Sequence, residues 1–222
     1  MKNNNSSTFI NWNYITISLM IFVVLTMLVL YLPQMREFDI AILKNIRKFL
    51  VQFPSYIPVF FSNYGGVGNF WWPQITAGAV LISHRKFLKT FLLIFFTQGS
   101  YVFVELFKNF ICRERPCSYE GYSFPSGHTF VTTCFYGILI YLVNYYVRSQ
   151  FWRIVLSIFF GFMIFMVSIS RLWLGVHFLS DVLAGLFGGF LFVNLYIVLD
   201  KFFTKNYILY KFLFYSCKER KT

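Results

Sequence analysis

The sequence predicts an all-α integral membrane protein, a bundle of six transmembrane helices with an interfacial amphipathic helix after the first span. Of the 222 residues, 58% are hydrophobic and only 13% are charged, whereas charged residues make up about a quarter of an ordinary soluble domain. Apolar runs long enough to cross a bilayer core, which takes about 20 helical residues, fill most of the chain. We therefore expect a single domain over residues 1–222, without a separate soluble domain.

The first two elements differ in their apolar pattern. Residues 14–32 form an apolar run that is too long for the core of a signal peptide and lacks a small-residue cleavage site, so we expect a transmembrane helix there. In the following segment, Leu43, Ile46, Leu50 and Phe53 recur at spacings of three and four, with basic residues between them. This pattern is typical of a helix that lies in the membrane interface with its apolar side down.

Five further spans are expected, at residues 59–82, 87–107, 129–147, 154–168 and 182–199. The first of these contains the stretch NYGGVGN, which we interpret as a helix break. A phosphate-binding glycine loop is the alternative, but neither a preceding strand nor a following Lys-Ser/Thr supports it. The C-terminal tail from Lys201 mixes lysines with aromatic residues, and we expect it to lie on the membrane surface.

The basic excess of the chain indicates its orientation in the membrane. Twenty Lys and Arg residues stand against eight Asp and Glu, which gives a formal net charge of +12. With a cytoplasmic N-terminus, the inside segments carry 12 of these basic residues and the outside segments carry 8. The positive-inside rule then predicts cytoplasmic termini. We expect no nucleic-acid partner, because no basic tract carries interleaved stacking aromatics.

The four cysteines include no Cys-x-x-Cys pair and no His/Cys cluster at metal spacing, so we expect no metal site. Cys112 and Cys117 share one short loop. They can form a disulfide if that loop faces an oxidising compartment, and the sequence leaves this open.

Three short stretches hold most of the polar residues that the membrane topology does not explain: residues 108–116, 125–128 and 170–181. Two expected spans separate the second stretch from the third, so the chain crosses the membrane twice between them and returns to the same face. We therefore expect all three stretches to meet at one membrane surface.

Their meeting would assemble three cations, two histidines and one carboxylate: Lys108, Arg115, Arg171, His128, His177 and Asp181. Converging cations repel one another without an anion between them, and guanidinium groups match the oxygens of a phosphoryl group. An aspartate four residues from a histidine on a helix can fix the imidazole tautomer and leave the other nitrogen as nucleophile or base. With a second histidine to protonate the leaving oxygen, the set is complete for two-step phosphoryl transfer.

The stretch Pro125-Ser126-Gly127-His128 adds backbone groups to this set. Gly127 lets the backbone come close to a ligand, and Ser126 offers a hydroxyl and an N–H. His128 lies where the next helix is expected to begin, and helix N-termini bind phosphate through free N–H groups and the helix dipole.

These stretches resemble the three-part signature of the type 2 phosphatidic acid phosphatases (PAP2), which share a superfamily with bacterial acid phosphatases and vanadium haloperoxidases. The matching positions are Lys108, six residues, then Arg115-Pro116; the four residues 125–128; and Ser170-Arg171, five residues, His177, three residues, then Asp181. The resemblance implies a PAP2-like core over about residues 59–199 and a metal-independent lipid phosphatase that needs no cofactor.

The resemblance also implies a role for each matched residue. His177 would be the nucleophile that becomes phosphohistidine, and Asp181 would orient it. His128 would protonate the leaving alcohol and help to activate water in the second step. The phosphoryl oxygens would be held by Lys108, Arg115, Arg171, Ser126 and Gly127.

Four acidic or basic residues near the signature, and one tyrosine, match none of its positions. We interpret Arg113 and Glu114 as structural. Glu120 and Tyr122, in the bridge between Pro116 and Pro125, are candidate substrate contacts. Glu105 lies within an apolar span, and we expect it to pair with Lys108 or with another cation of the site.

The leading functional hypothesis is a phosphatase in the bacterial cytoplasmic membrane whose active site faces the periplasm and removes phosphate from an anionic lipid. Lipid A phosphate ranks first, since a basic surface tolerates a bulky anionic glycolipid. Undecaprenyl pyrophosphate, phosphatidylglycerol phosphate and phosphatidic acid are alternatives. A lipid phosphotransferase and a non-enzymatic membrane transporter also remain, and the sequence does not set the oligomeric state.

Overall fold

The computed structural model describes residues 12–65 and 71–219, without the side chains of residues 64, 65 and 207–219. The regular structure of this part is entirely helical. Its eight helices are α1 (Trp12–Tyr31), α2 (Gln34–Leu50), α3 (Tyr56–Gly65), α4 (Trp71–Ser83), α5 (Phe87–Ile111), α6 (Gly127–Tyr146), α7 (Gln150–Trp173) and α8 (Leu179–Glu219). Among the described residues, five helices are long and apolar enough to span a membrane: α1, α5, α6, α7 and the part of α8 up to Asn206. The predicted all-α membrane fold is confirmed.

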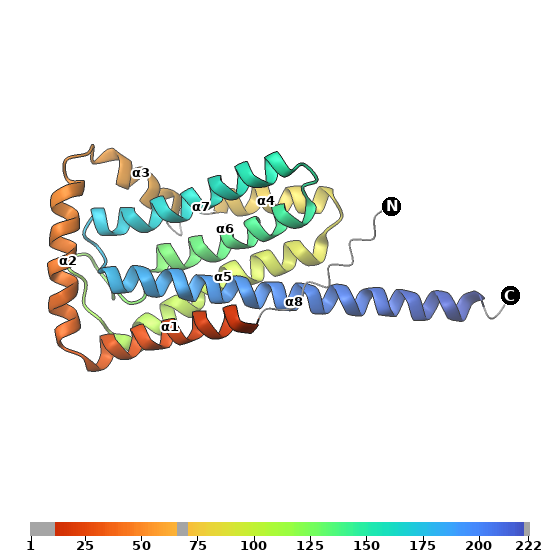
Figure 1. Cartoon of the computed structure of the whole chain (residues 1–222), viewed down its shortest axis with the longest axis horizontal. Coiled ribbons are helices and arrows are strands. Elements are labelled where there is room, and N and C mark those ends of the chain that lie inside the picture. Colours follow the sequence, from red (N-terminus) through yellow and green to blue (C-terminus); the bar gives the residue numbers. More distant parts are fainter. Residues whose placement is uncertain (1–11, 66–70, 220–222) are drawn as a thin grey trace.

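Two short helices stand where the sequence predicted a single span over residues 59–82. Helix α3 has 10 residues and α4 has 13, and each is shorter than the roughly 20 residues that a full crossing needs. Helix α3 packs against α7, and α4 packs against α5 (Figure 1). Helix α3 ends at Gly65, within the predicted break NYGGVGN, and residues 66–69 of that stretch lie outside the described part.

Helix α6 lies at the centre of the bundle and packs against α5, α7 and α8. Two glycines bring α8 especially close to it. A Cβ atom on Gly185 would lie 2.8 Å from the carbonyl oxygen of Ser126, and one on Gly189 would lie 2.5 Å from that of Phe130. A Gly-x-x-x-Gly pair of this kind allows membrane helices to approach along their backbones. The beginning of α6 is thereby held against the beginning of α8.

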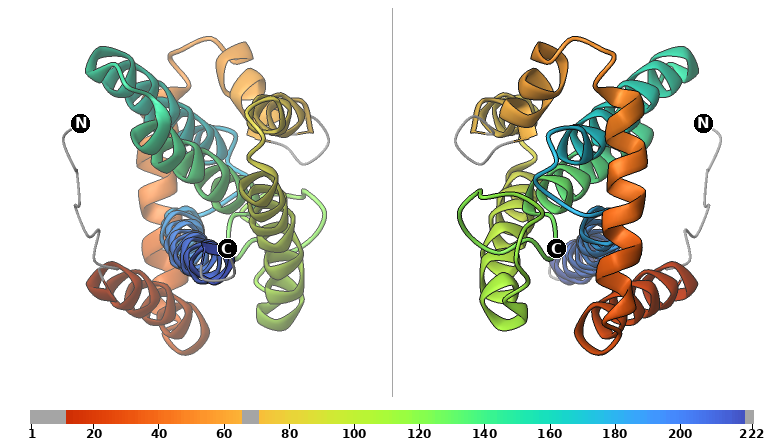
Figure 2. Two further views of the ribbon diagram at one scale, coloured as in Figure 1. Left: turned by 90° about the vertical axis from the view of Figure 1, so that its right-hand side faces the viewer. Right: turned by 90° about the vertical axis from the view of Figure 1, so that its left-hand side faces the viewer.

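Helix α2 crosses one end of the bundle, at a steep angle to the spanning helices (Figures 1 and 2). This placement agrees with the predicted interfacial helix. Its apolar face, however, covers the protein rather than lipid alone. Leu43 is 6% exposed and packs in a cluster with Leu172, Phe178 and Val182 from the end of α7 and the beginning of α8.

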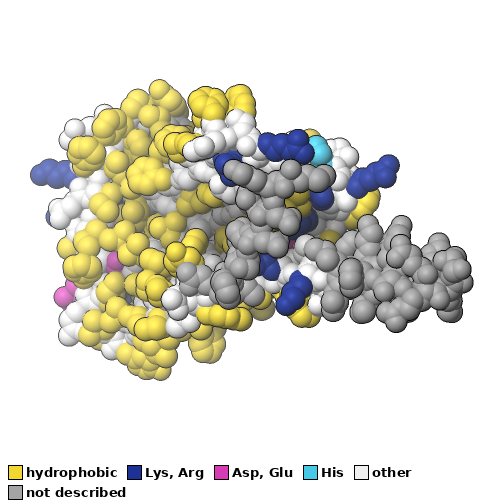
Figure 3. Space-filling model, turned by 45° about the vertical axis from the view of Figure 1, so that its right-hand side comes forward, with side chains coloured by type: hydrophobic (Ala, Val, Ile, Leu, Met, Phe, Trp, Pro, Cys, Tyr) yellow, Lys and Arg dark blue, Asp and Glu magenta, His cyan; other side chains and the backbone are white. Residues whose placement is uncertain are grey.

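The C-terminal tail differs from the expected surface-lying segment. Helix α8 continues without interruption to Glu219 and extends away from the bundle at the end opposite α2. The side chains beyond Asn206 lie outside the described part. Lys and Arg side chains gather near this end of the molecule, while apolar side chains cover the flank of the bundle (Figure 3).

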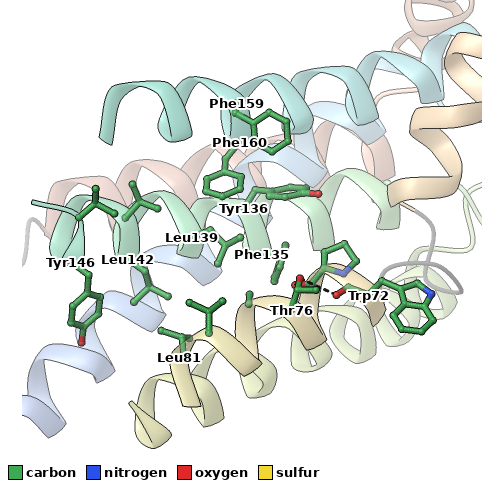
Figure 4. Close-up of a pocket in the computed structure, with 15 residues that line it drawn as sticks. Trp72, Thr76, Leu81, Phe135, Tyr136, Leu139, Leu142, Tyr146, Phe159 and Phe160 are labelled. Carbon is green, nitrogen blue, oxygen red and sulfur yellow. Dashed lines mark hydrogen bonds between the residues drawn. The ribbon is translucent and has the colours of Figure 1, made fainter. Parts of the chain in front are cut away.

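An apolar groove of about 570 Å³ opens between α4, α6 and α7 (Figure 4). Aromatic side chains from all three helices line it, among them Trp72, Tyr136 and Phe160. None of its lining residues is charged. An apolar groove of this composition suits the hydrocarbon chains of lipids.

A buried ion pair joins the spanning helices at the end of the bundle opposite α2. Lys89 on α5 donates to both carboxylate oxygens of Asp200 on α8. Tyr141 on α6 donates to Oδ2 of the same carboxylate at 2.8 Å. The side chains of Lys89 and Asp200 are 9% and 2% exposed, so neither charge can turn to water if its partner is lost.

We expect Lys89→Met to lower the free energy of unfolding by about 3–5 kcal/mol, because it leaves the Asp200 carboxylate buried without its counter-ion. The double variant Lys89→Met/Asp200→Leu should recover most of this loss. Thermal unfolding in detergent measures both effects. The matched control is Arg148→Gln, which removes an exposed cation and should change stability by less than about 0.5 kcal/mol. A Lys89→Met variant as stable as the control would contradict the prediction.

Candidate active site

Four helix ends meet beneath α2: α5 ends at Ile111, α6 begins at Gly127, α7 ends at Trp173 and α8 begins at Leu179. Contacts between them join the three polar stretches. Arg115 of the first stretch lies 3.2 Å from Nε2 of His177 in the third. The N–H of Ser126 in the second donates to the carbonyl oxygen of Asp181 at 3.0 Å. The prediction that the three stretches meet at one face is confirmed.

His177 and Asp181 are buried at the beginning of α8, with exposed fractions of 1% and 0%. Oδ2 of Asp181 accepts the N–H of Phe178 at 2.8 Å and lies 3.5 Å from Nδ1 of His177. That second distance is longer than a hydrogen bond, but the carboxylate faces Nδ1. On the other side of the ring, Nη1 of Arg115 faces Nε2. Because a guanidinium group only donates, Nε2 is the acceptor and Nδ1 carries the proton.

This environment favours the neutral form of His177. Burial holds the pKa of its imidazole well below the usual range, and the positive charges of Arg171, Arg115 and Lys108 lower that pKa further. Near pH 7 the ring is therefore unprotonated at Nε2, and the lone pair of that nitrogen is available as a nucleophile.

Lys108 lies between an acidic partner and the beginning of α6. Its Nζ donates to Oε1 of Glu105 at 2.7 Å, which confirms the predicted pairing of Glu105. The same Nζ would lie 3.4 Å from a Cβ atom on Gly127. The ammonium group of Lys108 therefore lies directly against the beginning of α6.

Arg171 is 4% exposed and donates through Nη1 to the hydroxyl of Ser62 on α3. Its Nε has no hydrogen-bond partner among the described residues. A buried guanidinium with an unsatisfied N–H suits an anionic ligand with several acceptor oxygens. No sequence pattern singles out Ser62, because an isolated serine in an apolar span is common.

The expectation that the N–H of Ser126 binds the phosphoryl group is wrong. Its N–H is already bonded to the carbonyl oxygen of Asp181, and its hydroxyl lies 3.1 Å from that of Thr129. The residue is fully buried, so its N–H is not available to a phosphate group. The first turn of a helix leaves its N–H groups without partners in the helix, and in α6 that turn contains Gly127 and His128.

His128, in the first turn of α6, is only partly buried. It is close enough to Arg171, His177, Lys108 and Arg115 for electrostatic interaction with each. Of the two histidines, His177 is the more deeply buried. Both imidazoles thus lie among the same three cations.

The bridge between Pro116 and Pro125 folds partly onto Arg115. The guanidinium carbon of Arg115 lies 5.0 Å from the ring centre of Tyr119, and Nε donates to the carbonyl oxygen of Gly121 at 3.1 Å. Tyr122 is 37% exposed, and a hydrogen bond with Cys112 raises the pKa of its hydroxyl. Glu120 is exposed. The proposed substrate contacts of Glu120 and Tyr122 stay predictions.

The cysteines of this region are not joined. Cys112 and Cys117 are both free and exposed, so the disulfide that the sequence allows is not formed in this structure. Among the described residues, no group of three or more His, Cys, Asp or Glu gathers in a way that could hold a metal ion. The expectation of a metal-free site stays a prediction.

Arg113 and Asp39 contact the cluster although the sequence had not assigned them to it. Nη1 of Arg113 donates to Oδ1 of Asp181 at 2.6 Å, and Nη2 donates to Oδ2 of Asp39 on α2 at 2.7 Å. The structural interpretation of Arg113 was therefore incomplete. Glu114 instead forms an exposed ion pair with Arg36 at 2.9 Å. Asp39 carried one sequence signal, an acidic residue four positions before Leu43 on the apolar face of a basic helix.

A family model described as the PAP2 superfamily matches residues 89–205. This range is just over half of the chain and includes all three polar stretches. This chain belongs to the PAP2 superfamily. The resemblance seen in the sequence is thereby confirmed.

Two relatives from Bacillus subtilis extend the comparison. Phosphatidylglycerophosphatase B of strain 168 is 32% identical over 127 residues, which are 54% of this chain and 63% of the relative. The match thus spans less than two thirds of that protein. The crystal structure of a transmembrane PAP2-type phosphatidylglycerolphosphate phosphatase aligns with a TM-score of 0.77 and 24% identity, over 85% of this chain and 96% of that one. This second likeness shows a shared membrane fold.

Proposed function

We propose that this multi-pass membrane protein is a lipid phosphatase that hydrolyses phosphatidylglycerol phosphate through a phosphohistidine on His177. The observation that carries the proposal is the buried, neutral imidazole of His177, whose Nε2 faces Arg115 within a group of three cations. Membership of the PAP2 superfamily and the two Bacillus subtilis phosphatases support the same class of reaction.

The first chemical step forms a bond between Nε2 of His177 and phosphorus, while the bond from phosphorus to the lipid oxygen breaks. His128 gives its proton to that oxygen, so the lipid leaves as an alcohol. Asp181 stabilises the charge that develops on the imidazole. Arg115 faces Nε2 in this structure, and the oxygens of a bound phosphoryl group would draw it, with Lys108 and Arg171, into contact with themselves.

In the second step, a water molecule attacks the phosphohistidine and gives a proton to His128. The bond between Nε2 and phosphorus breaks, inorganic phosphate leaves, and His177 returns to its neutral form. The balance of the two steps is one water consumed for each phosphate released. Transfer to a second alcohol in place of water would make the protein a phosphotransferase.

The preferred substrate is revised by the comparisons. Lipid A phosphate ranked first from the sequence, but both relatives are named for phosphatidylglycerophosphate. We therefore place phosphatidylglycerol phosphate ahead of lipid A phosphate, undecaprenyl pyrophosphate and phosphatidic acid. The apolar groove between α4, α6 and α7 offers space for lipid chains.

The proposed location is the bacterial cytoplasmic membrane, with cytoplasmic termini and the active site at the periplasmic face. The distribution of basic residues along the sequence supports this orientation, since a cytoplasmic N-terminus puts 12 of the 20 Lys and Arg residues in inside segments. The positive-inside rule then favours cytoplasmic termini. The cluster beneath α2 then faces outward.

A panel of four lipids tests the function and its substrate together. Purified protein in mixed micelles receives phosphatidylglycerol phosphate, lipid A phosphate, undecaprenyl pyrophosphate or phosphatidic acid, and the release of inorganic phosphate is measured. We expect kcat/KM for phosphatidylglycerol phosphate to exceed the others by about tenfold or more. Release from none of the four would contradict the proposed function, and a higher value for another lipid would contradict the proposed substrate. His177→Asn protein prepared in parallel controls for contaminating phosphatases.

A further inference from the structure

One face of α2 follows the segment that carries His177 and Asp181. Asp39, Leu43 and Arg47 recur at intervals of four residues, so they lie on the same side of the helix. Asp39 is fully buried, and Leu43 packs against Phe178. The guanidinium group of Arg47 approaches within 2.9 Å of where a Cβ atom on Gly175 would lie. Helix α2 therefore supports this segment along more than two of its own turns.

Asp39 accepts the hydrogen bonds of donor groups at the beginning of α8, although it belongs to another helix. Its Oδ1 accepts the N–H of Ser180 at 3.1 Å, and its Oδ2 accepts the hydroxyl of the same residue. Ser180 is the second residue of α8, where N–H groups have no partner within the helix. A carboxylate there also interacts favourably with the positive end of the helix dipole. Asp39 thus acts as a cap for α8 that another helix supplies.

Arg113 joins this cap to Asp181. Besides its bond to Asp39, the guanidinium group donates through Nη1 to Oδ1 of Asp181 at 2.6 Å and to the Ser180 hydroxyl at 2.7 Å. Its central carbon lies 4.5 Å from the ring centre of Phe178. The side chain of Arg113 is 10% exposed, and those of Asp39 and Asp181 are 1% and 0% exposed. One guanidinium group is thus shared between two buried carboxylates.

Arg113 and the backbone divide the two oxygens of Asp181 between them. Arg113 holds Oδ1, while Oδ2 accepts the N–H of Phe178 and faces Nδ1 of His177. A guanidinium group that serves only one carboxylate tends to bind both of its oxygens. Without Asp39, Arg113 would be free to take both oxygens of Asp181 and to turn them away from His177.

We propose that Asp39 on the interfacial helix is a positioning residue for the phosphoryl transfer, which it controls by dividing Arg113 between two carboxylates and capping α8. The inference rests on the proposed function, since it concerns the reactivity of His177. It makes α2 a part of the active-site architecture in addition to its place in the membrane interface.

The first test is the Asp39→Asn variant, assayed for hydrolysis of phosphatidylglycerol phosphate. We expect kcat to fall about 10- to 100-fold, as displacements of about 1 Å in a reacting group can produce. KM should stay within about twofold, because Lys108, Arg115 and Arg171 still bind the phosphoryl group. A folded Asp39→Asn variant with the kcat of the wild type would overturn the proposal.

The matched control is Arg36→Gln, which lies one turn earlier on α2. It removes another ion pair between this helix and the loop, the pair with Glu114, whose side chains are 58% and 76% exposed. Exposed pairs of this kind contribute little to stability. We expect Arg36→Gln to keep kcat within about twofold of the wild type. A loss equal to that of Asp39→Asn would assign the effect to any weakening of α2 and overturn a specific role for Asp39.

The pH dependence of kcat/KM in Asp39→Asn distinguishes a positioning role of Asp39 from a general loosening of the site. The charged or titratable groups that act on His177 are Asp181, Arg115, Arg171, Lys108 and His128. Because Asp39→Asn leaves the positive charge of Arg113 to Asp181 alone, Asp181 stabilises protonated His177 less, and the acid limb of kcat/KM should move to lower pH. A site that is merely loosened admits water, which reduces the cost of charging the ring, and the limb moves to higher pH. An unchanged or upward-shifted limb would overturn the proposal.

A second variant covers the case in which Asp39→Asn does not fold. Arg113→Lys keeps the positive charge but cannot span two carboxylates with a planar fork. We expect a comparable loss of kcat, and a wild-type kcat would overturn the proposal. The wild type is measured alongside: if it releases no phosphate from any lipid, the proposed function has failed. An active wild type with unaffected variants refutes only the role of Asp39.

Discussion

Replacing His177 with asparagine is expected to lower kcat for lipid phosphate hydrolysis by about 10⁴- to 10⁶-fold. Asparagine fills a similar volume, but its amide nitrogen has no lone pair able to attack phosphorus. The wild-type ring is buried, and its Nε2 is held as an acceptor by Arg115. Water that enters in place of the nucleophile would lack this positioning. The rate of phosphate release from phosphatidylglycerol phosphate is the measurement.

Binding of the phosphoryl group should survive the loss of His177. Lys108, Arg115 and Arg171 are unchanged in His177→Asn, and these cations provide the attraction for phosphate. Inorganic phosphate should therefore raise the melting temperature of the variant about as much as that of the wild type. If inorganic phosphate did not raise the melting temperature of His177→Asn, the substitution would have damaged the binding site. A kcat within about tenfold of the wild type would contradict the role of His177 as nucleophile.

Replacing His128 with alanine is expected to lower kcat for the lipid about 10²- to 10⁴-fold, the usual contribution of general acid catalysis. The size of the loss should depend on the leaving group. A lipid alkoxide needs a proton as it departs, whereas the anion of para-nitrophenol leaves without one. His128 is only partly buried, whereas His177 is 1% exposed.

A burst experiment isolates the first chemical step in His128→Ala. With para-nitrophenyl phosphate, the first turnover should release para-nitrophenol at nearly the wild-type rate. Later turnovers should be slow, because no residue remains to activate water for the second step. The expected trace is a burst of about one product per protein. An equal first-turnover loss for the aryl and the lipid substrates would contradict the role of His128 as proton donor.

The central contacts of the candidate site were predictable because their determinants are local in the sequence. His177 and Asp181 lie four residues apart, so a helix beginning between them brings the two side chains to one place. The number of spans between His128 and Arg171 requires the second and third stretches to return to one face. Both arguments need only spacing and parity, and the structure brings these residues together.

The supporting contacts were not predictable in the same way. Asp39 and Ser180 are 141 positions apart, and Ser62 and Arg171 are 109 apart. Neither pair belongs to a motif, and each depends on how α2 and α3 pack against the bundle. The division of residues 59–82 into α3 and α4 has the same origin, since hydropathy measures apolar length but not where packing ends a helix. The bond of the Ser126 N–H likewise depends on the close approach of α6 and α8.

The choice of lipid was the least secure inference from the sequence for a related physical reason. The three stretches describe a phosphoryl group, which all four candidate lipids share. Discrimination depends on contacts with the remainder of the headgroup. Glu120, Tyr122 and the short bridge that carries them have no fixed chemistry in the sequence alone. The comparisons, rather than any motif, moved phosphatidylglycerol phosphate to the first rank.

The measurement that tests the central claim most directly is the trapping of the covalent intermediate on His177. Para-nitrophenyl phosphate with radioactive phosphorus is mixed with His128→Ala protein, and the reaction is stopped in alkaline detergent during the burst. The account predicts a label on the peptide that contains His177, stable to alkali and lost in acid, as a phosphorus–nitrogen bond requires. A burst of para-nitrophenol with no label on that peptide would contradict it.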